Sequence, residues 1–313
     1  MRVFNSKTLL ALLLLIAARP AFAQRLATPQ RPPIIDVHLH AFGRGGAGSP
    51  PNPVTGKAPA ARTDEEAFEA TLAELRRHNV VKAVVSGPAE DVRRWRDAEP
   101  GRFIGGAFAS ESVALPEVSH LRRELLAGRF GVMGELGLQY AGLAPNDPQL
   151  EAYFALAEEL DIPVGVHTGL GPPRAPYEFA PRFRARLGSP LLLEEVLIRH
   201  PRLRLYIMHA GWPYLSETVA LMYMYPQVYA DLSAINWVLP REEFHEYLRA
   251  LMRAGFGKRL MFGSDQMLWP EAVGMAVEGI ESAEFLTAEQ KRDIFYNNAA
   301  RFLKLEGAQF TKQ

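Results

Sequence analysis

Three polar residues alternate with apolar ones in a short segment near the start of the chain, IIDVHLH at residues 34–40. Successive side chains of a β-strand point to opposite faces, so Asp36, His38 and His40 are expected to share one face. Burying three such groups together is unfavourable unless hydrogen bonds or coordination compensate for the lost water. The pattern therefore predicts a metal site, because imidazole nitrogens and carboxylate oxygens are good ligands for divalent metals.

Further candidate ligands stand at the ends of four other strand-like segments. These residues are Glu135, His167, His209 and Asp265, which follow the apolar parts of FGVMGELG, IPVGVHTG, LRLYIMHAG and KRLMFGSD. The chain contains no cysteine, which excludes disulfides, thiolate ligands and a thiol nucleophile. Nitrogen and oxygen ligands in this mixture suit one or two zinc ions, with iron, manganese or nickel as alternatives.

Eight strand-like runs alternate with helical patterns along the chain, which predicts a single-domain (β/α)8 TIM barrel over residues 34–305. The runs are 34–40, 80–87, 102–109, 130–137, 162–169, 203–211, 227–233 and 258–265, with helical stretches at 64–78, 116–127, 148–160, 190–200, 241–254 and 285–303. A doubly wound open sheet is the second choice, because the sequence lacks the glycine-rich phosphate fingerprint after the first strand. Because barrel enzymes build their sites at the C-terminal strand ends, the candidate ligands should meet there.

Two kinds of residue mark the predicted helix starts. Thr63 is expected to cap the helix at 64–78 while Glu66 reaches back to form a capping box. Pro148, Pro190 and Pro240 lie near other helix starts, where a missing N–H costs little.

Residues 1–23 have the features of a cleavable signal peptide. A basic start precedes the apolar run TLLALLLLIAA, and AFA at 21–23 offers small residues for cleavage after Ala23. The apolar run is shorter than the roughly 20 residues that span a bilayer, so no stable membrane anchor is expected after cleavage. The sequence therefore predicts export, most simply to a bacterial periplasm, followed by an extension at 24–33 and a tail at 306–313.

The charge balance bears on the kind of partner. Removing Arg2, Lys7 and Arg19 with the signal peptide leaves 32 basic residues against 35 acidic ones. A slightly acidic protein is not expected to bind nucleic acid, which is usually recognised by a basic surface. The expected partner is a small-molecule substrate, and the sequence does not indicate an oligomeric state.

The chain resembles the amidohydrolase superfamily, and within it the amidohydrolase-related (amidohydrolase 2) branch. The resemblance rests on D-x-H-x-H at 36–40, His167 and His209 on the fifth and sixth strands, and Asp265 on the eighth. YNNAARFL at 296–303 is similar to the closing helix of that branch. The likeness covers residues 34–303.

The resemblance implies roles for individual residues. His38, His40, His167 and Asp265 would be metal ligands, and His209 would be a ligand of a second metal or a catalytic group beside a single one. Many relatives bridge two metals with a carboxylated lysine on the fourth strand, where this chain has Glu135. That glutamate resembles the one used by phosphotriesterase-like lactonases and TatD-type nucleases, which favours Glu135 as a ligand. Asp36 would orient a ligating histidine.

These residues predict a metal-dependent hydrolase of an amide, lactone or other ester of a small carbonyl compound. A bound metal would activate water, and Asp265 would take and return its proton. Substrate contacts are expected from residues that follow the strand ends, namely Arg44, Arg174, Tyr177, Trp212 and Trp269.

Three other functions remain open. A metal-dependent decarboxylase resembling aminocarboxymuconate semialdehyde decarboxylase would need one metal and would leave Glu135 unligated. An exported binding protein without catalysis would not need Asp265 placed as a base. A nuclease receives some support from GELGLQY at 134–140, against the acidic charge balance and the signal peptide.

Overall fold

The computed structural model describes residues 31–42 and 50–305. The predicted signal peptide at 1–23, most of the extension at 24–33, Arg44 and the tail at 306–313 lie outside the described residues.

Eight parallel strands form one sheet in which every strand pairs with its neighbours in chain order. The strands are β1 (Ile34–His40), β2 (Val80–Gly87), β3 (Phe103–Ala109), β4 (Val132–Leu136), β5 (Val164–Val166), β6 (Leu205–Ile207), β7 (Tyr229–Asp231) and β8 (Leu260–Met261). Each lies inside one of the predicted runs. The strictly consecutive order excludes the doubly wound sheet, whose strand order reverses at a switch point.

Hydrogen bonds between the first strand and the segment after β8 close the sheet into a barrel. The amide of Val37 donates to the carbonyl of Phe262 at 3.0 Å, and the amide of Asp265 donates to the carbonyl of His38 at 2.8 Å. Further along, the amide of His40 donates to the carbonyl of Gln266 at 2.9 Å. This closure, with a helix after every strand, gives the expected barrel.

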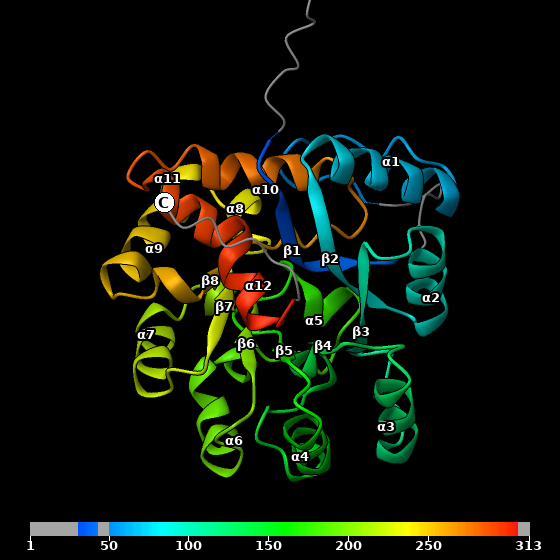
Figure 1. The fold of residues 1–313 in the computed structure, drawn as a ribbon, viewed down its shortest axis with the longest axis vertical. Coiled ribbons are helices and arrows are strands. Elements are labelled where there is room, and N and C mark those ends of the chain that lie inside the picture. Colours follow the sequence, from blue (N-terminus) through cyan, green and yellow to red (C-terminus); the bar gives the residue numbers. More distant parts are fainter. Residues whose placement is uncertain (1–30, 43–49, 306–313) are drawn as a thin grey trace, which may run out of the picture. The chain divides into compact units, whose positions relative to one another are not determined.

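Helices surround the strands on the outside (Figure 1). The outer helices are α1 (Asp64–Arg77), α2 (Ala89–Ala98), α3 (Val118–Leu126), α4 (Glu151–Glu159), α6 (Glu194–Arg199), α7 (Leu215–Met224), α9 (Arg241–Arg253) and α10 (Ala272–Glu281). Shorter helices are α5 (Ala175–Glu178), α8 (Ile235–Val238), α11 (Ala288–Arg292) and α12 (Asn298–Phe302). The predicted helix at 285–303 is therefore divided into α11, a π-helical turn at Asp293–Asn297 and α12.

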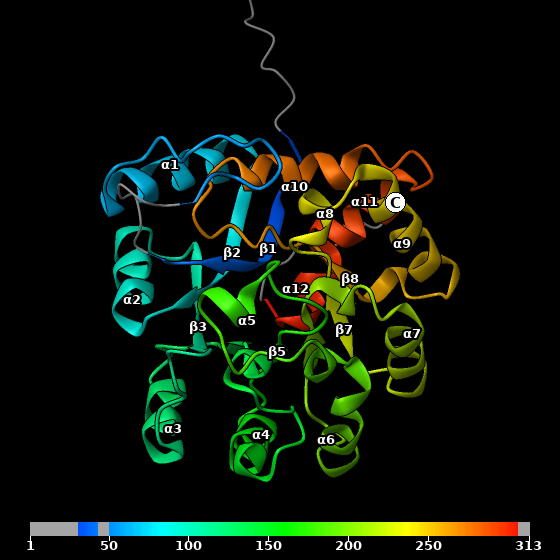
Figure 2. The ribbon, with the colours of Figure 1, turned by 180° about the vertical axis from the view of Figure 1, so that it is seen from behind.

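The two ends of the barrel are covered by different elements. Phe302 of α12 packs on Tyr206 and Tyr229 in the inner core, and the backbone carbonyl of Phe302 accepts a hydrogen bond from Arg204 just before β6. The helix α12 thus closes the N-terminal end, in front of the barrel in Figure 1. From behind, α5 and the segment after β5 lie in front of the opposite end (Figure 2). That opposite end is where the strands finish and where the candidate ligands are.

Helix capping agrees with the sequence in part. Thr63 Oγ1 accepts from the amide of Glu66 at 3.1 Å, as predicted. The Glu66 carboxylate accepts from the amide of Arg62 at 2.6 Å instead of from Thr63, so the predicted capping box is half formed. Thr287 and Gln290 make a complete capping box at α11. Among the described residues, no helix has both the length and the apolar character required to cross a membrane.

Candidate metal centre

Six imidazole and carboxylate side chains converge at the C-terminal end of the barrel. They come from β1 (His38, His40), β4 (Glu135) and the residues just after β5, β6 and β8 (His167, His209, Asp265), and none is more than 7% exposed. His209 and Asp265 have φ values of 57° and 52°, which lie in the left-handed region that non-glycine residues seldom adopt. Such conformations are found preferentially at functional sites, where the surrounding structure enforces them.

The first ligand group consists of His38, His40, Glu135 and Asp265. The two Nε2 atoms of His38 and His40 lie 3.2 Å apart, and Nε2 of His40 is 3.0 Å from Oδ1 of Asp265. Oε2 of Glu135 is 3.2 Å from Nε2 of His40 and 3.5 Å from Nε2 of His38. Ligands about 2.1 Å from one ion at tetrahedral angles lie roughly 3.4 Å from one another. The separations therefore fit a common divalent cation.

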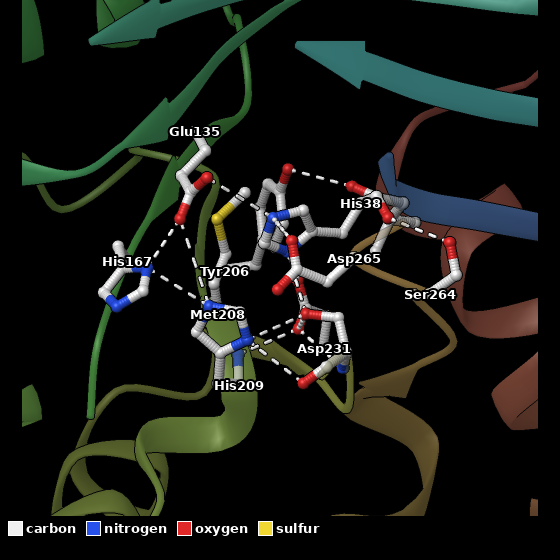
Figure 3. Close-up of polar contacts among 12 residues, drawn as sticks. His38, Glu135, His167, Tyr206, Met208, His209, Asp231, Ser264 and Asp265 are labelled. Atoms are coloured by element: carbon white, nitrogen blue, oxygen red, sulfur yellow. Dashed lines mark hydrogen bonds and ion pairs between the residues drawn. The ribbon is translucent and has the colours of Figure 1, made fainter. Parts of the chain in front are cut away.

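The second ligand group consists of Glu135, His167 and His209. The other carboxylate oxygen of Glu135, Oε1, lies 2.5 Å from Nδ1 of His167 and 3.9 Å from Nε2 of His209. Nε2 of His209 is 3.2 Å from Nδ1 of His167. Glu135 thus belongs to both groups and turns one oxygen toward each, as Figure 3 shows. A ligand atom of His209 also lies within 4.8 Å of ligand atoms of His38 and Asp265, so the two groups adjoin.

The tautomers of two histidines follow from their partners on the far side of each ring. Nδ1 of His209 lies 3.0 Å from the backbone carbonyl of Ser233, which can only accept, so Nδ1 carries the hydrogen. Nδ1 of His38 likewise lies 3.0 Å from Oδ2 of Asp231. In both rings the Nε2 lone pair is therefore left free to face the cluster, as a metal ligand requires.

Carboxylates and imidazoles of the cluster stabilise each other's charged forms. Burial would raise the pKa of Glu135, but hydrogen bonds with His167 and His38 hold that pKa well below its usual range. Burial would lower the pKa of His38, yet the carboxylates of Asp265 and Asp231 raise it well above the usual value. Ionised carboxylates beside buried imidazoles attract cations, and a divalent metal would displace the protons from the rings.

Asp231 and Ser233 are residues that the sequence reasoning missed. Oδ1 of Asp231 accepts from the backbone amide of His209 at 2.9 Å and from Oγ of Ser233 at 2.6 Å. Oγ of Ser233 also lies 2.8 Å from Nδ1 of His38 and 3.0 Å from Nδ1 of His209. Both residues are fully buried and together fix one histidine of each ligand group. Their signal was present in QVYADLS, where they stand at the end of the seventh predicted strand.

Asp36 lies beside the cluster. The pairing of β1 with β2 shifts register between Asp36 and Leu39, which interrupts strict alternation. Oδ1 of Asp36 accepts from the backbone amides of His38 and Ser264, each at 3.0 Å. Burial raises the pKa of Asp36 to about 6, against the hydrogen bonds from Ser264 and His38. Asp36 thus holds the backbone of a candidate ligand, while Asp231 and Ser233 hold its ring.

The predicted substrate contacts are dispersed. Arg174 is exposed and pairs with Glu178 at 2.7 Å, and Tyr177 is 84% exposed. Nε1 of Trp212 donates to Glu243 at 3.2 Å, and Trp269 is buried with Nε1 donating to the carbonyl of Pro50 at 3.0 Å. The structure gives none of these four a contact with the cluster. The aromatic rings that do contact candidate ligands are Phe42, Phe108 and Tyr140.

Among curated proteins, one relative matches part of the chain. The chain is 24% identical over 159 residues to Protein fluG of Emericella nidulans, a match that covers 46% of this chain and 17% of that protein. The chain therefore spans about a sixth of the length of this relative.

Several solved structures share the fold. An uncharacterized TIM-barrel protein from Bordetella bronchiseptica has a TM-score of 0.64 and 18% identity, covering 87% of this chain and 98% of that one. A protein from Acinetobacter baumannii described as a "probable 2-pyrone-4,6-dicarboxylic acid hydrolase", with citric acid bound, has a TM-score of 0.60 and 16% identity over 87% and 99% of the two chains. A 2,6-dihydroxybenzoate decarboxylase from Rhizobium has a TM-score of 0.57 and 15% identity over 88% and 99%.

The family is shown by a sequence model that spans nearly the whole barrel. The model described as Amidohydrolase matches residues 35–305, which include all six residues of the two ligand groups. This family generally uses a divalent metal, and its match over nearly the whole barrel makes this chain an enzyme of the amidohydrolase superfamily. The chain belongs to the amidohydrolase family.

Proposed function

We propose that this enzyme is a metal-dependent hydrolase with two metal ions bridged by Glu135, acting on an amide, lactone or other ester of a small carbonyl compound. The position of Glu135 carries the proposal, because its two carboxylate oxygens face different groups of histidines. Glu135 would hold one cation with each carboxylate oxygen, beside the histidines of the corresponding group. Such paired sites serve hydrolytic displacement, in which water attacks and a leaving group departs.

When bound, the two cations would lower the pKa of a water molecule and polarise the oxygen of the substrate carbonyl. The chain supplies the proton carrier. Burial would raise the pKa of Asp265, but the charge of His38 and the hydrogen bond with His40 lower it, so Asp265 remains a carboxylate. A buried carboxylate in this position can accept a proton from the attacking water and return it to the leaving group.

His209 has a different role in this proposal. Burial and the neighbouring His167 lower the pKa of His209, which keeps its ring neutral at neutral pH. A neutral ring with Nδ1–H bonded to the carbonyl of Ser233 offers Nε2 as a ligand. His209 is therefore assigned to the second metal, beside His167. Zinc is the first candidate for both positions, followed by manganese, iron and nickel.

The test is the number of metal ions per chain. Elemental analysis of purified protein reconstituted with zinc should give two ions for the wild type, and one or none for Glu135→Ala. Glu65→Ala, which removes an exposed carboxylate on α1, is the matched control and should retain two. One ion in the wild type, unchanged in Glu135→Ala, would overturn the bridged site and favour the alternative function, a metal-dependent decarboxylase.

Hydrolysis itself is tested on a panel of esters, lactones and amides beside a panel of aromatic and unsaturated carboxylic acids. Acid release from the first panel supports the proposal, whereas carbon dioxide release from the second supports the decarboxylase. Absence of both activities from protein carrying two metals would point to a metal-binding protein without catalysis.

We also propose export of the enzyme, on the basis of residues 1–23 alone. The intact mass of the protein expressed in a bacterium should correspond to a chain beginning at Gln24. Full-length mass and recovery with the cytoplasm would contradict this proposal.

A further inference from the structure

The segment between β5 and α6 forms a compact loop with a small core of its own. The amide of Gly169 donates to the carbonyl of Gly188 at 2.8 Å, which holds the two ends of residues 170–187 together. Three side chains inside the loop are buried and form a cluster separate from the barrel core, namely Ala175, Ala180 and Phe183. The loop contains α5 and lies at the C-terminal end of the barrel, as Figure 2 shows. Residues 170–187 are called the β5–α6 loop below.

The outer surface of this loop carries several apolar side chains. Tyr177 is 84% exposed, Phe179 is 53% exposed and Leu170 is 38% exposed. Three prolines of the loop are also exposed, namely Pro172, Pro173 and Pro181. Single apolar side chains are ordinary on a protein surface, but several gathered in one loop indicate a surface that contacts a partner.

The same loop is basic. It contains four arginines and a single acidic residue. Two of the arginines are paired with carboxylates, Arg174 with Glu178 at 2.7 Å and Arg182 with Glu111 at 3.3 Å. Arg184 and Arg186 are exposed, and within residues 31–42 and 50–305 neither lies in an ion pair with a carboxylate. The hydrogen bonds of Arg184 go to backbone carbonyls of its own loop. The loop therefore presents uncompensated positive charge beside exposed rings.

Exposed aromatic rings among arginines are typical of surfaces that bind an anionic lipid bilayer. A tyrosine is favoured at the level of the lipid headgroups, where its ring contacts apolar groups and its hydroxyl stays in water. Each arginine close to an anionic bilayer strengthens binding about fivefold. The chain as a whole is not basic, but at physiological salt charges more than about 8 Å away are largely screened. The local charge of the loop therefore governs its attraction to such a surface.

A folded protein partner explains these features less well. A stable protein interface buries about 800 Å² on each partner, and charged residues are depleted from its core. In the β5–α6 loop the arginines alternate with the apolar side chains. Lipid headgroups can rearrange around such a mixed surface, so that rings enter the interface while guanidinium groups contact phosphates.

We propose that the β5–α6 loop docks the enzyme reversibly on an anionic lipid bilayer. Tyr177 and Phe179 would lie among the headgroups, and Arg184 and Arg186 would contact lipid phosphates. The C-terminal end of the barrel, where the loop lies, would then face the bilayer. The inference goes beyond the proposed function and does not depend on it, because no residue of the candidate metal centre takes part.

Co-sedimentation with vesicles tests this inference. Full-length protein is mixed with vesicles of phosphatidylcholine, or with vesicles of phosphatidylcholine and phosphatidylglycerol in equal parts. We expect at least about tenfold tighter binding to the anionic vesicles, and loss of most of this difference at about 1 M salt. Equal binding to both kinds of vesicle, or no binding to either, would overturn the inference.

A double variant assigns the binding to the loop. Arg184→Gln with Arg186→Gln should weaken binding to the anionic vesicles at least about tenfold, because two positive charges are lost. The matched control is Arg93→Gln with Arg94→Gln, which removes two exposed arginines of α2 and should leave binding unchanged. Wild-type binding by the loop variant would overturn the inference, since the bilayer would then be bound by another part of the chain, such as residues 1–23.

A second variant distinguishes a bilayer from an acidic protein. Tyr177→Ser should weaken vesicle binding at least about threefold, because ring surface would no longer be withdrawn from water. The control, Tyr223→Ser, removes a ring that is 77% exposed on α7 and should have no effect. Soluble polyglutamate should bind more weakly than the anionic vesicles do. Tighter binding of polyglutamate, with no effect of Tyr177→Ser on vesicle binding, would overturn the lipid assignment in favour of an acidic protein partner.

Discussion

Oδ2 of Asp231 lies 3.0 Å from Nδ1 of His38, and neither side chain is exposed to solvent. The carboxylate holds the imidazole so that its other nitrogen faces the first ligand group. Carboxylates in this position fix the orientation of a ligating histidine and increase its basicity. Asp231 is therefore expected to act on the metal through His38.

Asp231→Ala should weaken the binding of one metal ion about 10- to 100-fold, because His38 loses its orienting partner. Titration with zinc against a competing chelator would measure the change. Asp231→Asn retains an acceptor without the charge and should give an intermediate loss. Asp97→Ala removes an exposed aspartate on α2 and is the matched control. A folded Asp231→Ala protein with wild-type zinc affinity would contradict this role.

The two ligand groups should be separable by substitution. His40→Ala removes a ligand from the first group only, and His167→Ala removes one from the second only. Each protein is expected to retain about one metal ion in place of two and to lose hydrolysis, because the paired site needs both ions. Elemental analysis beside an ester assay gives both values. The control is His120→Ala, an exposed histidine on α3. Full activity in either variant would refute a paired centre.

The strands and the candidate ligands could be predicted because their signals are local. Short apolar runs of β type predicted all eight strands, and a polar residue at a strand end is informative once parallel strands are assumed. This rule alone places the six candidate ligands at one end of a barrel, namely His38, His40, Glu135, His167, His209 and Asp265. The same rule applied to Asp231 and Ser233 would have found them, but a carboxylate and a hydroxyl without a histidine form no recognisable pattern.

The surroundings of the site could not be predicted, because they depend on packing between distant segments. The indole nitrogen of Trp269, a predicted substrate contact, donates to the carbonyl of Pro50 across 219 positions in the chain, and no local pattern indicates that bond. Alternation predicts that Asp36 shares a face with both histidines of β1, but the register shift between Asp36 and Leu39 interrupts alternation, and Asp36 accepts from the backbone amide of His38. Phe108 contacts His40 from a different strand, β3, and alternation within β1 does not reveal that contact.

Asp265→Asn should lower turnover about 100- to 10,000-fold, because an amide cannot accept and return a proton. The free energy of unfolding should change far less. Steady-state kinetics and urea unfolding on the same preparation would separate the two effects, and zinc content must be measured because Asp265 is also a candidate ligand. Near-full activity in Asp265→Asn would show that the proton is carried by another group.

Gly165→Ala should destabilise the barrel interior beneath the site. A Cβ at this position would lie 2.5 Å from Cζ of Tyr206 and 2.6 Å from Cε of Met208, closer than packed atoms allow. Overpacking of this kind costs about 1 to 3 kcal/mol. Urea unfolding would measure the loss. Gly101→Ala would not be a neutral control, because Gly101 has a φ of 87°. Ala155→Gly on α4 is used instead, and it should change the free energy of unfolding by about 1 kcal/mol. Wild-type stability of Gly165→Ala would mean that Tyr206 can move aside.

His78 should make the stability of the barrel depend on pH. Burial, and then the charge of Arg31, lower the pKa of His78 below its ordinary 6.5, against the attraction of Glu74. The folded state therefore binds fewer protons than the unfolded state. The contribution of the uncharged His78 ring to the free energy of unfolding is fully present above pH 6.5. It is lost as the pH falls through the lower pKa of His78 in the folded state.

Replacing this histidine by a residue that does not titrate should remove that part of the pH dependence. Urea unfolding of wild type and His78→Gln, at pH values above and below 6.5, gives the difference between the two proteins at each pH. The stability of the wild type should fall more than that of His78→Gln as the pH is lowered, and the exposed His120→Gln is the matched control. Equal losses in wild type and His78→Gln would show that Glu74 stabilises the charged imidazole as well as water does.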